Sequence, residues 1–227
     1  MSSMSNYLEN GLTDMLRRGK PFVIGANQYQ CVATATAPAV VTPTTYWGLL
    51  NVKMWVPSWS PTVGDFTVKP DSAGTLHLLK ATTVASATGT SWPSVAIAND
   101  GTVTDGGVTW TDQYTALEAG IAANLPAEFS GGSYARAATV LDDTVWNNTQ
   151  AAGGTAASTG TNGTTANLST LTYTSMPAGN AGLYIEYDAA TGGNQWDYCF
   201  VTSGPVAVSA GANLTSPAGS LTIQIDN

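Results

Sequence analysis

Charge is what this chain of 227 residues most clearly lacks, since Asp, Glu, Lys and Arg together make up only 10% of it. Ordinary globular domains carry about 25%, so the polar surface must come from Thr, Ser, Asn and Gly. Seven Trp, nine Tyr and a hydrophobic content of 43% nevertheless argue against disorder, because they can bury enough area to offset chain entropy. So low a charge content suits a protein whose surfaces are covered by identical subunits of an assembly.

Basic residues are the scarcer charge type: seven Lys and Arg stand against fifteen Asp and Glu, for a net charge of −8. Beyond Lys80 the only basic residue is Arg136. This argues against binding to nucleic acid through a basic patch and against attraction to an anionic membrane. No run is long enough to span a bilayer, and no basic segment precedes an apolar stretch of the kind that directs secretion. We therefore expect synthesis in a cytoplasm.

Histidine and cysteine are also rare, which limits the available chemistry. A Ser-His-Asp triad needs a histidine base, and the single one, His77, lies in an apolar TLHLL run that favours a structural or surface role. Cys31 and Cys199 lie in apolar runs, so we expect buried free thiols, with a disulfide left open. The one adjacent carboxylate pair, Asp142 and Asp143, would point to opposite faces of a strand. We expect no enzyme, no metal and no cofactor.

Strand patterns dominate what is present, most clearly over residues 183–225. Three strand-length runs, LYIEY, QWDYCFV and SLTIQI, are rich in β-branched and aromatic residues and are separated by Gly, Pro, Asn and Ser. The break at 188–194, DAATGGN, supplies residues that tolerate positive φ and tight reversal. The pattern predicts an all-β, antiparallel fold in which this segment pairs with strands from the first 45 residues.

One helix is expected near the start, over residues 5–18. Ser5 suits the N-cap, while Gly19 and Pro21 suit the end. An apolar stripe at three- and four-residue spacing, followed by two arginines, comprises Tyr7, Leu8, Leu12, Met15, Leu16, Arg17 and Arg18. A helix this short is marginal alone, so the stripe either packs on its own domain or docks on a partner subunit.

Residues 55–112 differ in style from their surroundings. They hold four tryptophans and the only histidine. Short strand-like pieces, DFTVKP, TLHLLKATT and GVTWTD, predict a compact β unit, and 101–110 reads as a hairpin with Asp105-Gly106 as its turn. Further on, 115–128 predicts a short helix that ends before Pro126, and 147–167 is a low-complexity loop long enough to pack against a neighbour.

The tryptophans of this unit, Trp55, Trp59, Trp92 and Trp110, permit two interpretations. A small β unit needs large side chains for its own core. Exposed indole rings would instead form a stacking face for sugar rings. Trp59 and Trp92, each close to a proline, are the better candidates for an exposed, carbohydrate-facing pair.

Three stretches carry a family resemblance: YLENGLTDML at 7–16, GGSYAR at 131–136 and YDAATGGN at 187–194, the last accompanied by VSAGAN at 208–213 and PAGSLTI at 217–223. In this order they resemble a family of small tailed-bacteriophage virion proteins, often described as tail fibre proteins, to which jelly-roll-like cement and decoration proteins are close in style. Residues 55–112 resemble a second phage module that recurs on head and tail proteins and is thought to bind surfaces, with carbohydrate as one candidate.

The resemblance implies a jelly-roll-like antiparallel β-sandwich with a short N-terminal helix and a small inserted β domain, divided as 1–49, 50–114 and 115–227. It implies a virion structural protein made in the bacterial cytoplasm: a capsid cement or decoration protein, forming a homotrimer on the major capsid protein. The alternative is a tail fibre or baseplate protein that binds host-surface glycan through the inserted domain.

Overall fold

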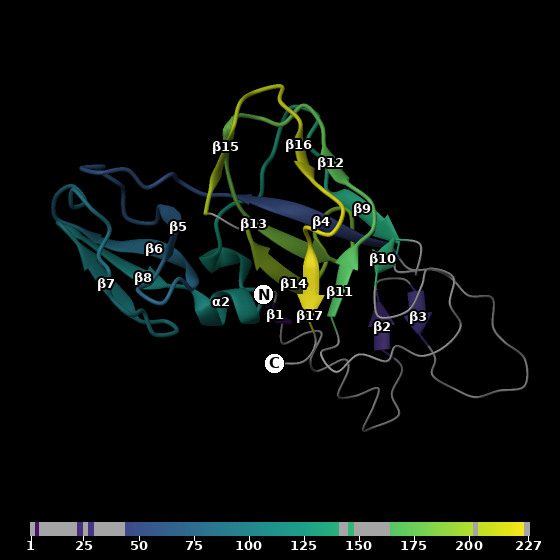
Figure 1. Ribbon diagram of the computed structural model, residues 1–227, viewed down its shortest axis with the longest axis horizontal. Helices are drawn as coiled ribbons and strands as arrows, with labels where there is room; N and C mark the ends of the chain where they lie inside the picture. The colour runs from purple at the N-terminus through teal and green to yellow at the C-terminus, as the bar shows by residue number, and fades with distance from the viewer. Residues whose placement is uncertain are drawn as a thin grey trace, which may run out of the picture.

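The computed structural model describes residues 3–4, 22–24, 27–29, 44–140, 145–147, 164–201 and 204–224. Strands make up 42% of the structure and helix 5%, in antiparallel sheets, which confirms the all-β prediction (Figure 1). The helix expected over 5–18, with its docking stripe and arginines, lies outside the described residues. So do Cys31, the Asp142-Asp143 pair and most of the 147–167 loop.

A central antiparallel sheet runs through the middle of the molecule, with strand order β1-β14-β13-β4-β9 and β15 pairing with β13 (Figure 1). Its strands are β1 (Ser3–Met4), β4 (Thr44–Asn51), β9 (Ala137–Val140), β13 (Gly179–Tyr187), β14 (Gln195–Phe200) and β15 (Val206–Val208). The runs LYIEY and QWDYCFV thus become neighbouring strands. β13 also pairs with residues 46–51 of β4, so its partner lies beyond the first 45 residues from which the sequence pattern predicted it, whereas Ser3–Met4 adds a short strand on the outer edge of β14.

Shorter strands accompany this sheet: β10 (Trp146–Asn147), β11 (Thr164–Asn167) and β17 (Thr222–Gln224) form one group, β12 (Leu171–Tyr173) and β16 (Leu214–Ser216) another, and β2 (Phe22–Ile24) and β3 (Asn27–Tyr29) a third. The run SLTIQI therefore pairs with β11 rather than with the central sheet. One face of the central sheet, carrying Trp47 and Tyr184, packs on Tyr173, Met176 and Leu221 in a buried cluster. The central sheet and the segments that carry Tyr173, Met176 and Leu221 thus enclose a core built from strands far apart in sequence.

A second sheet has the order β5-β6-β8-β7 and lies at the left of Figure 1. Its strands are β5 (Phe66–Pro70), β6 (Leu76–Val84), β7 (Thr102–Asp105) and β8 (Val108–Asp112), so the three strand-like pieces of this region are confirmed. The hairpin is one residue off the prediction. Asp105 pairs with Val108 as the last residue of β7, and the turn is Gly106-Gly107 with Gly106 at φ 61°, where a side chain is disfavoured.

The helix predicted over 115–128 is much shorter in the structure. It splits into α2 (Tyr114–Glu118) and the 3-10 turn η1 (Ala122–Asn124). Gly120 adopts φ 61° between them, and a left-handed glycine just past the last turn ends a helix. The short α2 buries Leu117 beneath the second sheet.

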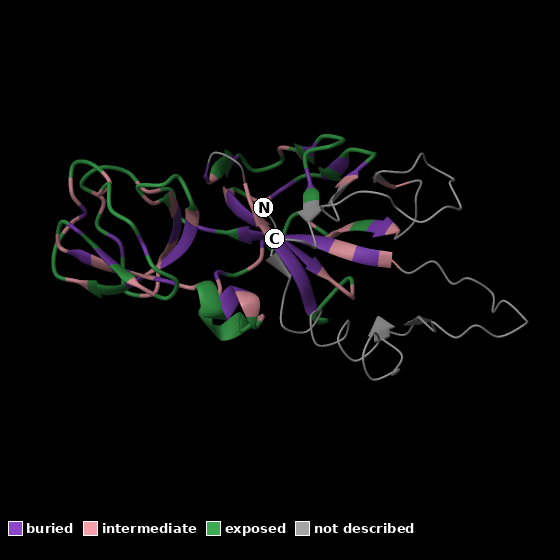
Figure 2. Ribbon diagram, turned by 60° about the horizontal axis from the view of Figure 1, so that its bottom comes forward, coloured by how far each residue is buried: buried purple, intermediate pink, exposed green. Residues whose placement is uncertain are grey.

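The two sheets share a buried junction. Leu50 and Ile185 of the central sheet, Val68 and Leu78 of the second sheet and Leu117 of α2 belong to one cluster. Figure 2 shows buried residues along the central sheet and on the second sheet, with exposed loops around the second sheet. The second sheet also has its own buried cluster around Trp110 and Leu79. It therefore forms a lobe with a core of its own, which packs on the other face of the central sheet.

Candidate functional site

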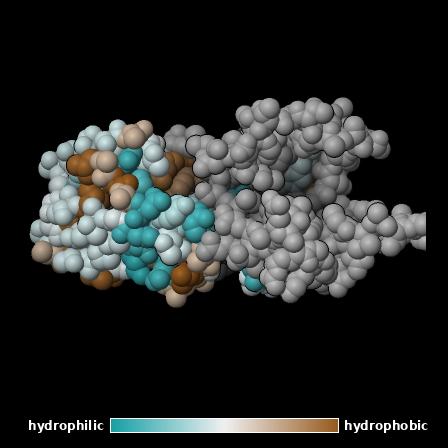
Figure 3. Space-filling model, turned by 90° about the horizontal axis from the view of Figure 1, so that it is seen from below, coloured by the Kyte–Doolittle hydropathy of each residue, from teal (hydrophilic) through white to brown (hydrophobic). Residues whose placement is uncertain are grey.

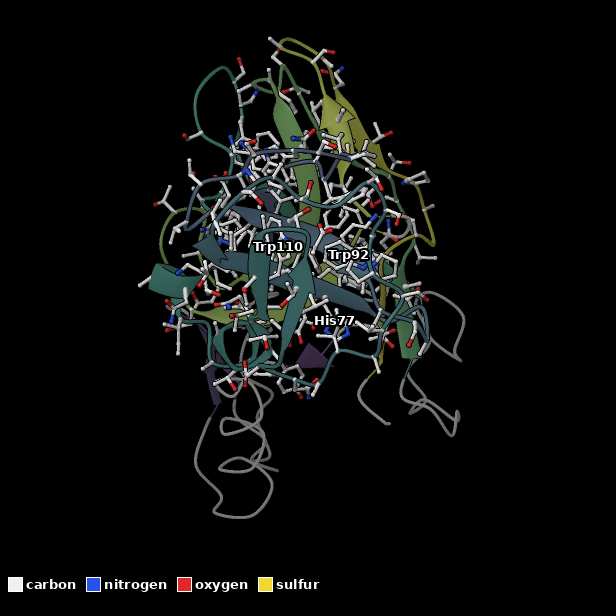
Figure 4. All side chains as sticks on the ribbon, turned by 90° about the vertical axis from the view of Figure 1, so that its left-hand side faces the viewer. His77, Trp92 and Trp110 are labelled. Atoms are coloured by element: carbon white, nitrogen blue, oxygen red, sulfur yellow. The ribbon has the colours of Figure 1, made fainter. Side chains whose placement is uncertain are left out.

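The four tryptophans of the second sheet gather around one core. Trp110 is fully buried, while Trp55, Trp59 and Trp92 are half-buried and pack against its cluster. Trp59 lies against Trp110 with ring centroids 5.5 Å apart, and Trp55 meets Trp92 edge-on at 6.0 Å. Figure 4 shows Trp92 and Trp110 on the same lobe. Trp59 and Trp92, expected as an exposed pair, therefore have different aromatic partners.

Lys69 lies over the rings of the Trp55–Trp92 pair, where a stacked ligand would otherwise sit. Its Nζ lies 4.8 Å from the ring centroid of Trp55 and 5.8 Å from that of Trp92, within cation–π range. Burial lowers the pKa of Lys69, and the carboxylate of Asp105 opposes this. The indole of Trp55 donates to Asp105 Oδ2 at 2.7 Å, and that of Trp92 to Pro70 O at 2.9 Å. These rings are held in place by the lobe itself.

His77 is a buried histidine between two carboxylates, apart from Trp92 and Trp110 (Figure 4). Its Nδ1 lies 3.2 Å from Asp112 Oδ1 and its Nε2 lies 3.9 Å from Asp71 Oδ2. The second oxygen of Asp112 accepts the backbone N–H of Asp100 at 3.0 Å. His77 therefore links β6 to the end of β8 through Asp112, while its Nε2 lies near Asp71 in the loop after β5 without a hydrogen-bond partner among the described residues.

A cavity of about 480 Å³ opens beside this histidine, at the junction of the two sheets. Residues from β6, β8, α2, β14 and the loops at 73–75 and 99 line it: Ala73, Gly74, Thr75, Leu76, His77, Asn99, Asp112, Tyr114, Leu117, Tyr198 and Phe200. A smaller hollow of about 270 Å³, lined by residues that include Lys53, Asp65 and Asn180, also lies between segments of both sheets. Neither cavity could be inferred from local sequence patterns, because the walls of each include segments more than 100 residues apart.

Arg136 joins the two C-terminal stretches that carry the family resemblance. Its guanidinium donates to both oxygens of Glu128, with Nη2 2.8 Å from Oε2. Its Nη1 donates to the carbonyls of Ala189 and Gly192 at 2.8 and 2.7 Å, and Cζ lies 3.5 Å from the ring centroid of Tyr187. GGSYAR and YDAATGGN are thus held together by one side chain, which is only 8% exposed.

Tyr134 anchors the same cluster to the central sheet. Its hydroxyl donates to Glu128 Oε1 at 2.8 Å and accepts the backbone N–H of Leu49 at 2.8 Å. Burial raises the pKa of Tyr134 well above its ordinary value, and the nearby carboxylate of Glu128 adds to the rise. A phenol that stays neutral keeps its proton, so it can donate to Glu128 while it accepts from the backbone of Leu49. We call Glu128, Tyr134, Arg136 and Tyr187 the arginine clamp.

The loop that the clamp holds, residues 188–194, is exposed at its tip and closed at its base. Asp188 accepts the backbone N–H of Asn194 at 2.7 Å and its side-chain amide at 2.8 Å. Gly192 and Gly193 take positive φ, as the turn requires. The loop is therefore a fixed projection at one end of β13 and β14, positioned by two strands and the clamp.

Two carboxyl groups are buried inside the central sheet. Glu186 on β13 and Asp197 on β14 are directly paired across the strands and are 3% and 1% exposed. Burial raises the pKa of Glu186 to about 8, a hydrogen bond from Thr45 lowers it, and the charge of Asp197 raises it further. Cys199, two residues on, is a free thiol whose pKa burial raises. Sequence reasoning did not single out Glu186, since an alternating LYIEY run ordinarily exposes its polar position.

No group of three or more His, Cys, Asp and Glu suited to a metal ion occurs in the described part of the chain. Within that same part, no helix has the length and hydrophobicity needed to cross a membrane. No family model matches the chain, and no curated protein matches it.

Proposed function

We propose that this protein is a structural component of a tailed-bacteriophage virion and acts as a cement or decoration protein on the outside of the head. The arginine clamp is the observation that carries the proposal. Arg136 links GGSYAR to YDAATGGN through hydrogen bonds to Glu128, Ala189 and Gly192. The stretches that resemble virion proteins therefore build a scaffold and a fixed exposed loop, as expected of a part whose work is adhesion.

The mechanism is geometric. A jelly-roll-like sandwich, assembled as a homotrimer, covers a seam between subunits of the major capsid protein, and buried area holds the shell against internal DNA pressure. The low charge density supports coverage by identical neighbours, because fewer charges need to lose water at each contact. The helix expected over 5–18 and the 147–167 loop supply the arms that reach neighbouring subunits, while the second sheet projects outward.

A tail fibre or baseplate role is the second candidate. It is favoured by the second sheet, whose Trp59 and Trp92 are half-exposed on a lobe joined to the central sheet through one cluster. In that role the lobe contacts a host-surface glycan. Lys69 works against this use of Trp92, because its Nζ lies 5.8 Å from the Trp92 ring centroid and 4.8 Å from that of the adjoining Trp55.

Labelling virions distinguishes the two roles. Gold-labelled protein is added to particles of the encoding phage that lack it, and the particles are imaged by electron microscopy. Label distributed over heads is expected. Label confined to tails would contradict the cement role and favour the second candidate.

A further inference from the structure

The cavity beside His77 has the size and position of a small-molecule site. Its volume of about 480 Å³ falls within the range of about 300–1,000 Å³ that ligand pockets occupy. It lies where β14 of the central sheet meets the second sheet and α2, and such junctions commonly hold ligands. Figure 3 shows the second-sheet lobe from below, with a hydrophilic band between separate hydrophobic patches.

The walls of this cavity include aromatic and neutral polar side chains in addition to His77 and Asp112. Tyr198 and Phe200 meet edge-on with ring centroids 6.2 Å apart, and Tyr114 adds a third aromatic residue to the lining. Thr75 and Asn99, both exposed, supply a hydroxyl and an amide. An amide and a hydroxyl both donate and accept hydrogen bonds, so the site can pair with ligand groups that do the same.

The charges around the cavity argue against an ionic ligand. Asp112 in its wall and Asp71 behind His77 repel anions, and the described lining residues include no Lys or Arg. A cation would need a carboxylate that can turn toward it. Asp112 already accepts bonds from His77 and from the backbone of Asp100 on its two oxygens, and Asp71 Oδ1 accepts two backbone N–H groups.

We propose that this cavity binds a neutral saccharide unit, whose apolar C–H face packs on an aromatic wall while its hydroxyls bond to Thr75 and Asn99. A sugar ring offers both features at once, an apolar face and hydroxyls that donate and accept. The assignment is separate from the Trp59–Trp92 pair expected from the sequence, because neither tryptophan lines the cavity. It goes beyond the virion role and holds for a head or a tail protein alike.

Saturation-transfer NMR on the full chain tests this proposal. The probes are the methyl glycosides of glucose, galactose, mannose and N-acetylglucosamine, with tetramethylammonium and acetate as charged probes. We expect transfer to at least one glycoside and none to either ion. Transfer to no glycoside, or equal transfer to tetramethylammonium, would overturn the saccharide assignment without bearing on where the protein sits in the virion.

Two substitutions on exposed lining residues locate the site. Tyr114→Ala removes an aromatic wall and Asn99→Ala removes an amide, and each should weaken glycoside binding by about tenfold or more. Val63→Ala is the matched control, since Val63 is 66% exposed on the same lobe but does not line the cavity. Circular dichroism confirms that each variant is folded.

The alternative site is tested in the same series by Trp59→Ala. Unchanged glycoside binding in this variant is expected. Loss of binding in Trp59→Ala, with Tyr114→Ala and Asn99→Ala unaffected, would place the sugar on the tryptophans and overturn the cavity assignment.

Discussion

Replacing Glu186 by Gln should make the protein more stable at alkaline pH, because the glutamate is buried with Asp197 opposite it. The folded protein holds Glu186 protonated up to a pKa of about 8, above its ordinary 4.5, chiefly because of burial. The unfolded chain releases this proton near 4.5. The contribution of Glu186 to stability is therefore fully present below about pH 4.5, is lost as pH rises toward 8, and stays lost above it.

The size of this effect follows from the same two values. A rise in pKa from 4.5 to about 8 corresponds to at most about 5 kcal/mol between the two ends of the window. Gln has nearly the same shape and no charge. The difference in unfolding free energy between Glu186→Gln and wild type should be small near about pH 4.5 and favour the variant by several kcal/mol above about pH 8.

Urea denaturation followed by tryptophan fluorescence measures this difference across the pH range. Taking the difference between the two proteins removes contributions from titrating groups that do not interact with residue 186, and Asp197, which does, remains part of the measured effect. Glu118→Gln is the matched control, because Glu118 is half-buried at the end of α2, where it accepts the hydroxyl of Tyr198. If the two stability profiles of Glu186→Gln and wild type stay parallel with pH, the reasoning on Glu186 is wrong.

Three further substitutions test the architecture. Arg136→Met should destabilise the protein by about 2–3 kcal/mol and speed hydrogen exchange at 188–194, with the 101–110 hairpin as internal control; unchanged exchange at 188–194 would refute the clamp. Gly106→Ala should cost about 2 kcal/mol or more in chemical denaturation, since φ is 61° and a Cβ would lie 2.6 Å from Gly89 N; a neutral effect would contradict the turn. Trp110→Ala should cost about 3–5 kcal/mol, measured in the same way, while a loss below about 1 kcal/mol would contradict its burial.

The sequence predicted the parts of the fold that depend on local pattern. Strands β13 and β14 follow from LYIEY and QWDYCFV, and the second sheet follows from its three strand-like pieces. It misplaced features set by backbone detail or by distant pairing. Gly120 ends α2 early and Gly106-Gly107 shifts the hairpin turn, while β17 pairs with β11, a partner that the local pattern of SLTIQI does not specify.

The candidate sites were less predictable, since each depends on contacts between distant segments. Arg136 stood out as the only basic residue beyond Lys80, yet nothing local indicates that it reaches residues 189 and 192. The aromatic side chains at 198 and 200 are recognisable as strand residues, but their place in a cavity with His77 requires the docking of two sheets. Glu186 reads as an exposed strand position but is buried in the central sheet.

The copy number of the protein in purified virions tests the central proposal most directly. Quantitative mass spectrometry gives it relative to the major capsid protein of the same particles. A decoration protein that covers seams across the head should be present on the order of hundreds of copies, because capsid symmetry repeats each seam many times. A count of about six or about twelve, as tail symmetry gives, would contradict the cement role.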